Sequence, residues 1–299
     1  VPMQGKRKKE LKQSLTAASF LAPSLLGLIL FSAVPVVFSM FISLTDWNYV
    51  NGIGNWNFVW FENFKKLWSD EWFRAALRNT FVYTVVTVPI GLFLAVVIAV
   101  LIDQFCAKKL AGMLRVTMYM PKICNIVASA AVWTMLYSTY GPFTQLMKAL
   151  GWADPPRFLA SYTWALPAVM LMSIWQGLGY HVFLYSASLT SLPKDIYEAA
   201  DLDGVNGIQR FFYITLPQLK PTTFFLTVTG IISSFKVFGS INVMTHGGPG
   251  SSTYTLVYYI YKSAFTYYEM GYASAVAMVL FAILLCVTLY QWHHNKNNY

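Results

Sequence analysis

One polar stretch, residues 191–221, carries the groups of this chain that are best suited to binding chemistry. It reads SLPKDIYEAADLDGVNGIQRFFYITLPQLKP and lies between two apolar segments, each long enough to cross a bilayer. Glu198 and Asp201 offer anionic contacts, and an apolar ridge is available from Leu202, Val205, Ile208 and Phe212. A chain this apolar has little reason to keep such a stretch unless a partner outside the membrane binds it. We therefore expect a docking site here.

The nucleophiles, acids and bases of the chain do not support an enzyme. His181 is a single helix residue without an evident carboxylate partner, and the histidines at 293–294 lie in a polar tail. Cys106, Cys124 and Cys286 fall in or beside apolar segments and lack the spacing of a disulfide framework or a metal site. No P-loop is present in the sequence, so this chain lacks that phosphate-binding motif of an ATPase. No metal, cofactor or catalytic residue is expected in this chain.

The composition is that of a membrane protein. Of the 299 residues, 57% are hydrophobic and 11% are charged, with a mean hydropathy of +0.50 and a net charge of +9. A soluble domain carries about 25% charged residues. A basic cluster precedes the first apolar segment and consists of Lys6, Arg7, Lys8, Lys9 and Lys12. Beside a membrane span, such a cluster indicates the cytoplasmic end rather than nucleic-acid binding.

The elements that must position these residues are six apolar helices. The predicted spans are roughly 17–44, 79–102, 116–138, 162–190, 219–241 and 272–292. The first is too long for a signal peptide and reads as an anchored span. We expect an all-α integral membrane protein with a basic N-terminus at 1–14 and one transmembrane domain at 15–299. The sequence opens on Val1 rather than Met, so a preceding segment is expected.

The distribution of basic residues predicts the orientation. With the N-terminus inside, twelve of the 21 Lys and Arg residues fall in cytoplasmic segments and seven in external ones. The positive-inside rule then places both termini and the 191–221 stretch in the cytoplasm. Outside, residues 45–78 contain FENFKKLWSDEWFRAAL, with aromatic and charged residues at helical spacing. This predicts a short helix, either on the outer membrane surface or packed on the external face of the protein.

The 191–221 stretch resembles the EAA loop of ABC-importer permeases. The matching residues are Glu198-Ala199-Ala200, Gly204, Ile214 and Leu216-Pro217. Outside the loop, SLTDWN at 43–48, NF at 63–64, NT at 79–80 and THGGPGSSTYTLVYYIY at 245–261 resemble the carbohydrate-uptake branch. The chain is similar to the larger permease of the maltose importer, without the extra N-terminal spans and the large external domain of that protein.

This resemblance implies an ABC-importer permease bundle that works by alternating access. Its expected partners are a second homologous permease, two ATPase subunits that bind ATP and Mg, and an extracytoplasmic solute-binding protein. Glu198 would pair with a basic residue of the ATPase, and Gly204 would allow the corner between two short helices. The residues implied in ATPase coupling are Glu198, Ala199, Ala200, Asp201, Gly204, Ile208, Phe212, Leu216 and Pro217.

The resemblance also implies an oligosaccharide site near the middle of the membrane. Counted without gaps from the loop, the sugar-contacting positions of the maltose permease fall on Ser173, Gln176, Gly177, Tyr180, Ser233, Ser234 and Val237; aligned on Pro121, they fall on Lys122 and Ile126. The first four share one helix face by their i, i+3, i+4 and i+7 spacing. Packing between helices through small and polar residues would explain the same pattern.

Two lysines suggest an acidic substrate. Lys122 stands where the maltose permease has an aromatic residue, and Lys236 lies beside the fifth-span positions. A lysine at the bilayer centre costs roughly 2.5–3.5 kcal/mol, which favours a use such as binding an alginate-like acidic oligosaccharide. Snorkelling to the headgroups is the alternative. Neutral oligosaccharides and glycerol phosphate stay open as substrates, whereas a passive channel or a sensor would not account for the 191–221 stretch.

Overall fold

The computed structural model describes residue 16, residues 18–52 and residues 54–296. Its regular elements, within these limits, are helices. Two isolated antiparallel β-bridges pair Thr45 with Phe58 and Asn48 with Glu269. The basic N-terminus predicted at 1–14 lies outside the described residues.

The helices follow one another with short connections. In chain order they are η1 (Ile29–Ala33), α2 (Val34–Ile42), η2 (Tyr49–Asn51), α3 (Glu62–Ser69), α4 (Glu71–Phe105), α5 (Lys108–Ile123), α6 (Ile126–Leu136), α7 (Pro142–Ala149), η3 (Phe158–Ala160), α8 (Ala165–Thr190), α9 (Lys194–Leu202), α10 (Gly207–Arg210), η4 (Phe211–Thr215), α11 (Leu216–Gln218), α12 (Lys220–Phe235), α13 (Gly239–Met244), α14 (Leu256–Phe265) and α15 (Met270–Lys296).

Four helical segments of the described chain are long and apolar enough to cross a membrane. They are Ala18–Ile42, Glu71–Phe105, Lys220–Met244 and Met270–His293, and each overlaps a predicted span. α8 has 26 residues but is not one of these four, and its sequence includes Gln176 and His181.

The stretch 116–138, which we expect to be one helix, is divided between α5 and α6. Cys124 is extended, and the Asn125 side chain accepts a hydrogen bond of 2.8 Å from the Val127 N–H. Asn125 therefore begins a new helix as its N-cap, in the manner usual for this residue type. An apolar run alone does not reveal such a break.

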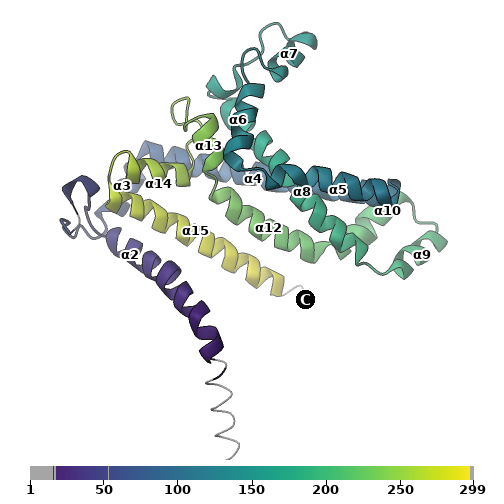
Figure 1. Ribbon diagram of the computed structural model, residues 1–299, viewed down its shortest axis with the longest axis horizontal. Coiled ribbons are helices and arrows are strands. Elements are labelled where there is room, and N and C mark those ends of the chain that lie inside the picture. The colour runs from purple at the N-terminus through teal and green to yellow at the C-terminus, as the bar shows by residue number, and fades with distance from the viewer. Residues whose placement is uncertain (1–15, 17, 53, 297–299) are drawn as a thin grey trace, which may run out of the picture.

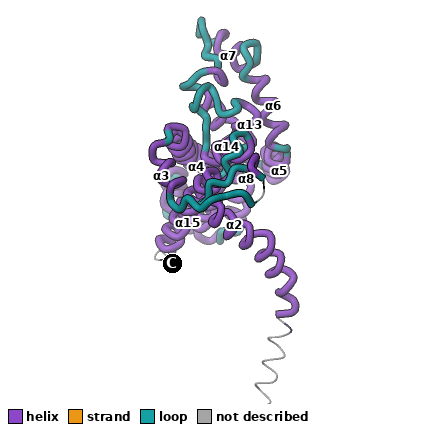
Figure 2. The backbone as a smooth tube through the Cα atoms, turned by 90° about the vertical axis from the view of Figure 1, so that its left-hand side faces the viewer, coloured by secondary structure: helices purple, strands orange, loops and turns teal. Residues whose placement is uncertain are grey.

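The long helices lie side by side, and several of the short ones lie at their ends. Figure 1 shows α4, α8, α12 and α15 running in the same general direction, with α9 and α10 at one end and α3 and α14 at the other. Seen along this direction in Figure 2, α6 and α7 project to one side of the bundle and the N-terminal helix to the other. In that helix only 6% of the apolar window of Ala18–Ile42 is buried.

Two apolar cores stabilise the bundle. The α14-end core joins α3, the first half of α4, α6, the first half of α8, and α13 to α15. The α9-end core joins the second half of α4, α5, the second half of α8 and the start of α12. α5 and α8 approach so closely that a Cβ built on Gly179 would overlap the Met118 carbonyl group. Only glycine fits at this crossing.

The corner between α3 and α4 is fixed by Asp70. Its Oδ1 accepts hydrogen bonds from the N–H groups of Trp72 at 2.8 Å and Phe73 at 3.3 Å, which caps α4. Its Oδ2 accepts hydrogen bonds from the hydroxyls of Tyr259 on α14 and Tyr272 on α15. Burial opposes the charged form, but these hydrogen bonds outweigh it and hold the pKa of Asp70 below its ordinary value.

The helix predicted within FENFKKLWSDEWFRAAL is α3, which ends at Ser69, so residues 71–78 already belong to α4. Leu67 is buried in the α14-end core, whereas Trp68 is 78% exposed. α3 is therefore anchored on the protein itself through Leu67.

Candidate functional site

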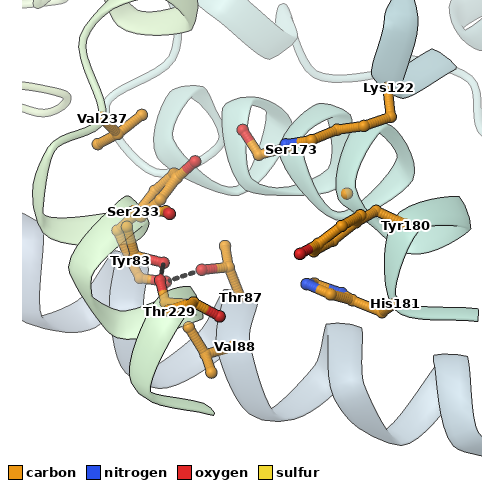
Figure 3. Close-up of a pocket in the computed structure, with 13 residues that line it drawn as sticks. Tyr83, Thr87, Val88, Lys122, Ser173, Tyr180, His181, Thr229, Ser233 and Val237 are labelled. Carbon is orange, nitrogen blue, oxygen red and sulfur yellow. Dashed lines mark hydrogen bonds between the residues drawn. The ribbon is translucent and has the colours of Figure 1, made fainter. Parts of the chain in front are cut away.

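A cavity of about 460 Å³ opens between α4, α5, α8 and α12 (Figure 3). It lies where the two cores meet, since Tyr83 and Val237 belong to the α14-end core and Val88 and Tyr180 to the α9-end core. The residues that line it are Tyr83, Thr87, Val88, Lys122, Ser173, Gly177, Tyr180, His181, Thr229, Gly230, Ser233, Ser234 and Val237.

The cavity lies near the middle of the membrane-spanning bundle. α4 has 35 residues and is about 52 Å long at ~1.5 Å per residue. Tyr83 and Val88 lie about 18 and 26 Å from its start on the same rise. The hydrocarbon core of a bilayer is about 30 Å thick. A cavity at this height along α4 is far from both ends of the helix.

Seven of the ten substrate positions expected from the sequence line this cavity. They are Lys122, Ser173, Gly177, Tyr180, Ser233, Ser234 and Val237. The other three do not line it. Ile126 packs near Gly239 of α13, Gln176 is half-buried on α8, and Lys236 is exposed at the end of α12.

The wall of the cavity on α4 was absent from the sequence-based set. Tyr83, Thr87 and Val88 have the i, i+4 and i+5 spacing of one helix face, but no motif anchors an alignment of α4 at these positions. The remaining lining residues outside the expected set are His181, Thr229 and Gly230. His181 directly follows Tyr180 in the sequence, and this neighbour is the signal that could have pointed to His181 as a cavity residue.

Several hydroxyl groups in the wall are oriented by their own helices. The Thr87 hydroxyl donates to the Tyr83 carbonyl at 2.7 Å, Ser173 to Val169 at 3.0 Å, and Ser234 to Gly230 at 2.8 Å. A hydroxyl that donates in this way keeps lone pairs that can accept a further hydrogen bond. The wall can therefore receive the hydroxyl groups of a sugar, with Tyr180 as an aromatic surface.

Lys122 brings positive charge to the cavity. Its Nζ lies 5.6 Å from the centre of the Tyr180 ring, and the Tyr180 ring centre lies 5.7 Å from that of His181. Among the lining residues, Lys122 is the one with a permanent charge, and none is a carboxylate. The site thus offers hydroxyl groups, one aromatic face and one ammonium group.

The 191–221 stretch forms the expected pair of short helices with a glycine corner. Gly204 has a φ of +70°, and the Val205 N–H donates to the Ala200 carbonyl at 3.1 Å, as in a Schellman C-cap. Asn206 then opens α10 through a capping box with Gln209. The sequence IQRFFYI at 208–214 suggests a short second helix that ends before Leu216-Pro217; this is wrong, because η4 and α11 continue helically through Gln218.

The two short helices and η4, which follows them, expose apolar side chains. Leu202 is 90% exposed, Ile208 73% and Phe212 56%. Ile208 and Phe212 line a groove of about 200 Å³ together with Leu101 of α4. Such surface on a polar loop is typical of an interaction site.

The other positions implied in coupling divide between surface and interior. Glu198, Ala199 and Pro217 are exposed, Leu216 is half-buried, and Ala200 is 5% exposed. The Asp201 side chain lies outside the described part of the structure. The Tyr197 and Thr215 hydroxyls lie 3.2 Å apart and join the two arms of the loop.

Comparisons with known proteins agree with this architecture. The family model of the "Binding-protein-dependent transport system inner membrane component" matches residues 63–296. The chain is 34% identical over 274 residues to the probable ABC transporter permease protein YurN of Bacillus subtilis (strain 168), covering 91% of this chain and 93% of that protein. It is 30% identical over 278 residues to the lactose transport system permease protein LacF of Rhizobium radiobacter, covering 92% of each.

A solved structure has the same fold. It is a crystal structure of a bacterial ABC transporter involved in the import of the acidic polysaccharide alginate, with a TM-score of 0.84 and 22% sequence identity. The match covers 98% of this chain and 99% of that chain. At this identity the likeness shows the fold alone.

Proposed function

This chain belongs to the family of binding-protein-dependent transport system inner membrane components, and we propose that it conducts an acidic, alginate-like oligosaccharide. It is a multi-pass permease subunit of an ABC sugar importer in the inner membrane. It is a transport component rather than an enzyme, and ATP is hydrolysed by partner subunits. A periplasmic binding protein delivers substrate to transporters of this kind.

The topology proposed here has six spans in a bacterial cytoplasmic membrane. Four are the long apolar segments, the third is α5 with α6, and the fourth is α8. Both termini and the loop with α9 and α10 face the cytoplasm, because the positive-inside rule favours that side for the basic residues. The end with α3 and α14 then faces the binding protein.

The partners proposed are a second homologous permease and two ATPase subunits that hold ATP and Mg. The N-terminal helix supports the first, because Phe20 and Phe31 are each 83% exposed on a segment that hardly touches its own bundle. The exposed apolar side chains of α9 and α10 support the second. Lipid covers the rest of the apolar surface.

The mechanism proposed is alternating access driven by the ATPases. Closure of the ATPase dimer would move α9 and α10, and the loop would transmit this movement to the spans that enclose the cavity. A nucleotide can drive such a change only if it binds the two states with different affinity. Glu198 and the exposed apolar residues provide the contact, and Gly204 the corner between the two helices.

One observation supports the proposal that the substrate is acidic: the ammonium group of Lys122 lines the sugar-sized cavity. Family membership does not select the substrate, since the LacF relative is a lactose transport permease. A lysine placed among apolar helices costs roughly 2.5–3.5 kcal/mol. An anionic group on the substrate would offset that cost.

The test is ATPase activity of the complete complex in liposomes, with its binding protein, against neutral and acidic oligosaccharides. We expect stimulation by acidic sugars, and a decrease of roughly tenfold or more in the K122M complex, because a hydrogen bond to a charged group is lost. K236M is the matched control, because both lysines are exposed but only Lys122 lines the cavity.

Equal stimulation of the parent complex by neutral sugars would contradict the acidic substrate. So would a K122M complex that behaves like K236M, because Lys122 would then serve only to reach the headgroups. The hydroxyl-rich wall would accept a neutral oligosaccharide equally well, so that alternative is distinguished by the same panel. Glycerol phosphate belongs in the panel as a small anion.

A further inference from the structure

We propose that His181 binds an acidic group of the substrate in the cavity that Lys122 also lines, with the Tyr180 ring between the two side chains. This rests on the proposed function, in that it takes an acidic sugar as the ligand. Figure 3 shows the His181 ring beside that of Tyr180, with the nitrogen-bearing end of the imidazole and the Tyr180 hydroxyl both directed toward the centre of the cavity.

The His181 imidazole has a polar atom that the described chain does not satisfy. Its Nδ1 is buried and forms no hydrogen bond with any described residue. The ring lies in a slot between two glycines, with Nδ1 3.9 Å from a Cβ built on Gly91 and Cε1 3.6 Å from one built on Gly177. Neither wall of the slot provides a side-chain donor or acceptor. Buried polar atoms without partners are rare and require an explanation.

The groups around the imidazole explain why its partner would be an anion. α5 contributes Lys122, which is positive, whereas Gly91 and Thr87 of α4 and Thr229 and Ser233 of α12 are uncharged. Tyr83 and Tyr180 are the other titratable side chains of the cavity, and no carboxylate lines it. The Lys122 ammonium and the His181 imidazole thus line one cavity, and no negatively charged side chain of the described chain lines it with them. A ligand carboxylate would provide one.

The chemistry of a uronic acid fits this arrangement. A carboxylate has two oxygens and accepts hydrogen bonds at both. An oligosaccharide of uronic acids carries a carboxylate on each sugar, so one carboxylate would accept a hydrogen bond from the Lys122 ammonium and another from Nε2–H of His181, because Nδ1 is enclosed against Gly91. An imidazolium donates more strongly than a neutral imidazole, so binding would be accompanied by proton uptake. Acidic sugars would then be favoured further as the pH falls, over the range in which a uronic acid stays ionised.

The experiment measures uptake by proteoliposomes containing the complete complex, supplied with binding protein saturated with either an acidic or a neutral oligosaccharide. We compare the parent with H181L, H181Q and the control H293Q, because His293 is exposed at the cytoplasmic end of α15. The expected result for H181L is a loss of roughly tenfold in the acidic-to-neutral preference, with neutral uptake retained. H181Q keeps part of the preference but loses its rise at low pH, and H293Q matches the parent.

Three results would overturn the role of His181. One is an H181L complex with the preference and pH profile of the parent. The second is an equal loss of uptake for the acidic and the neutral sugar together with a lower melting temperature. His181 would then be a packing residue between α4 and α8. The third is an H181Q complex with the pH profile of the parent. This variant decides the question if H181L does not assemble. A parent complex that prefers neutral sugars would instead refute the proposed substrate, which is a separate failure.

Discussion

At the scale of single residues, Asp70 joins more of the structure than any pattern around it suggests. One carboxylate oxygen caps α4, and the other receives two tyrosine hydroxyls from α14 and α15. In the sequence, Asp70 reads as one charge among several in an external segment. Tyr259 and Tyr272 lie 189 and 202 residues further along the chain. Local spacing carries no trace of such a contact, so only the folded arrangement reveals it.

We expect D70N to destabilise the protein by about 1–2 kcal/mol at pH 7, a magnitude reduced because the site is partly solvated. The folded pKa of Asp70 is lowered, so its contribution is complete above the unfolded pKa of about 3.9 and is lost as the pH falls through the lower folded value. Melting temperatures of parent and variant in detergent should therefore differ at pH 7 and converge at strongly acidic pH.

Glu71 provides the matched control for Asp70. It is exposed in the first turn of α4, so E71Q should change stability by no more than about 0.5 kcal/mol. Equal melting temperatures for D70N and the parent at pH 7 would show that the hydrogen bonds of Asp70 contribute nothing.

At the scale of elements, the sequence predicted the positions of the apolar segments better than their continuity. The lengths of the apolar runs located α8, α12 and α15, because these runs have clear ends. The same criterion joined α5 to α6, because Cys124 and Asn125 are too few to interrupt an apolar average. The resemblance to the maltose permease pointed to one face of the cavity on α8, whereas α4 offered no motif from which to place Tyr83 or Thr87. The residues on one face of a helix can be predicted from sequence where a recognisable motif lies nearby.

The crossing of α5 and α8 gives a sharp prediction about one element pair. G179A should lower stability by about 2 kcal/mol or more, because the new methyl group must displace the Met118 carbonyl and separate the helices. G112A is the control, since a Cβ there meets nothing within 4 Å on the same α5. It should be neutral or stabilising by up to about 1 kcal/mol. Thermal unfolding of both variants would decide, and equal effects would refute the close crossing.

At the scale of the whole molecule, the two ends of the bundle expose different surfaces. One end presents Leu202, Ile208 and Phe212 on α9, α10 and η4, and the far end presents aromatic side chains such as Trp68 of α3 at 78% exposure. The sequence predicted this polarity through its basic residues and its polar stretch. It could not show that Ile208 and Phe212 lie against α4 while Leu202 lies free of it, because that depends on how the loop folds back.

On the proposed topology, the end with α9 and α10 should carry the contact with the ATPase. We expect L202D to reduce co-purification of the ATPase subunits by roughly tenfold, since a central apolar anchor of an interface is replaced by a charge. Y140D introduces the same charge at an equally exposed site near α7 and should retain the subunits. Co-purification from membranes, followed by ATPase assay, measures both. Retention of the ATPase by L202D would exclude Leu202 from the contact.

The meeting of the two cores at the cavity has a mechanical consequence. α4 and α8 run through both cores, so each core can stay rigid only if bending is concentrated between them, at the height of Tyr83 and Tyr180. If the two cores move as rigid parts during transport, a ligand in that space would resist their rotation. A bound substrate would then make the bundle stiffer than the empty one. Variants that change only the flexibility between the two cores should alter transport without altering any contact to the ligand.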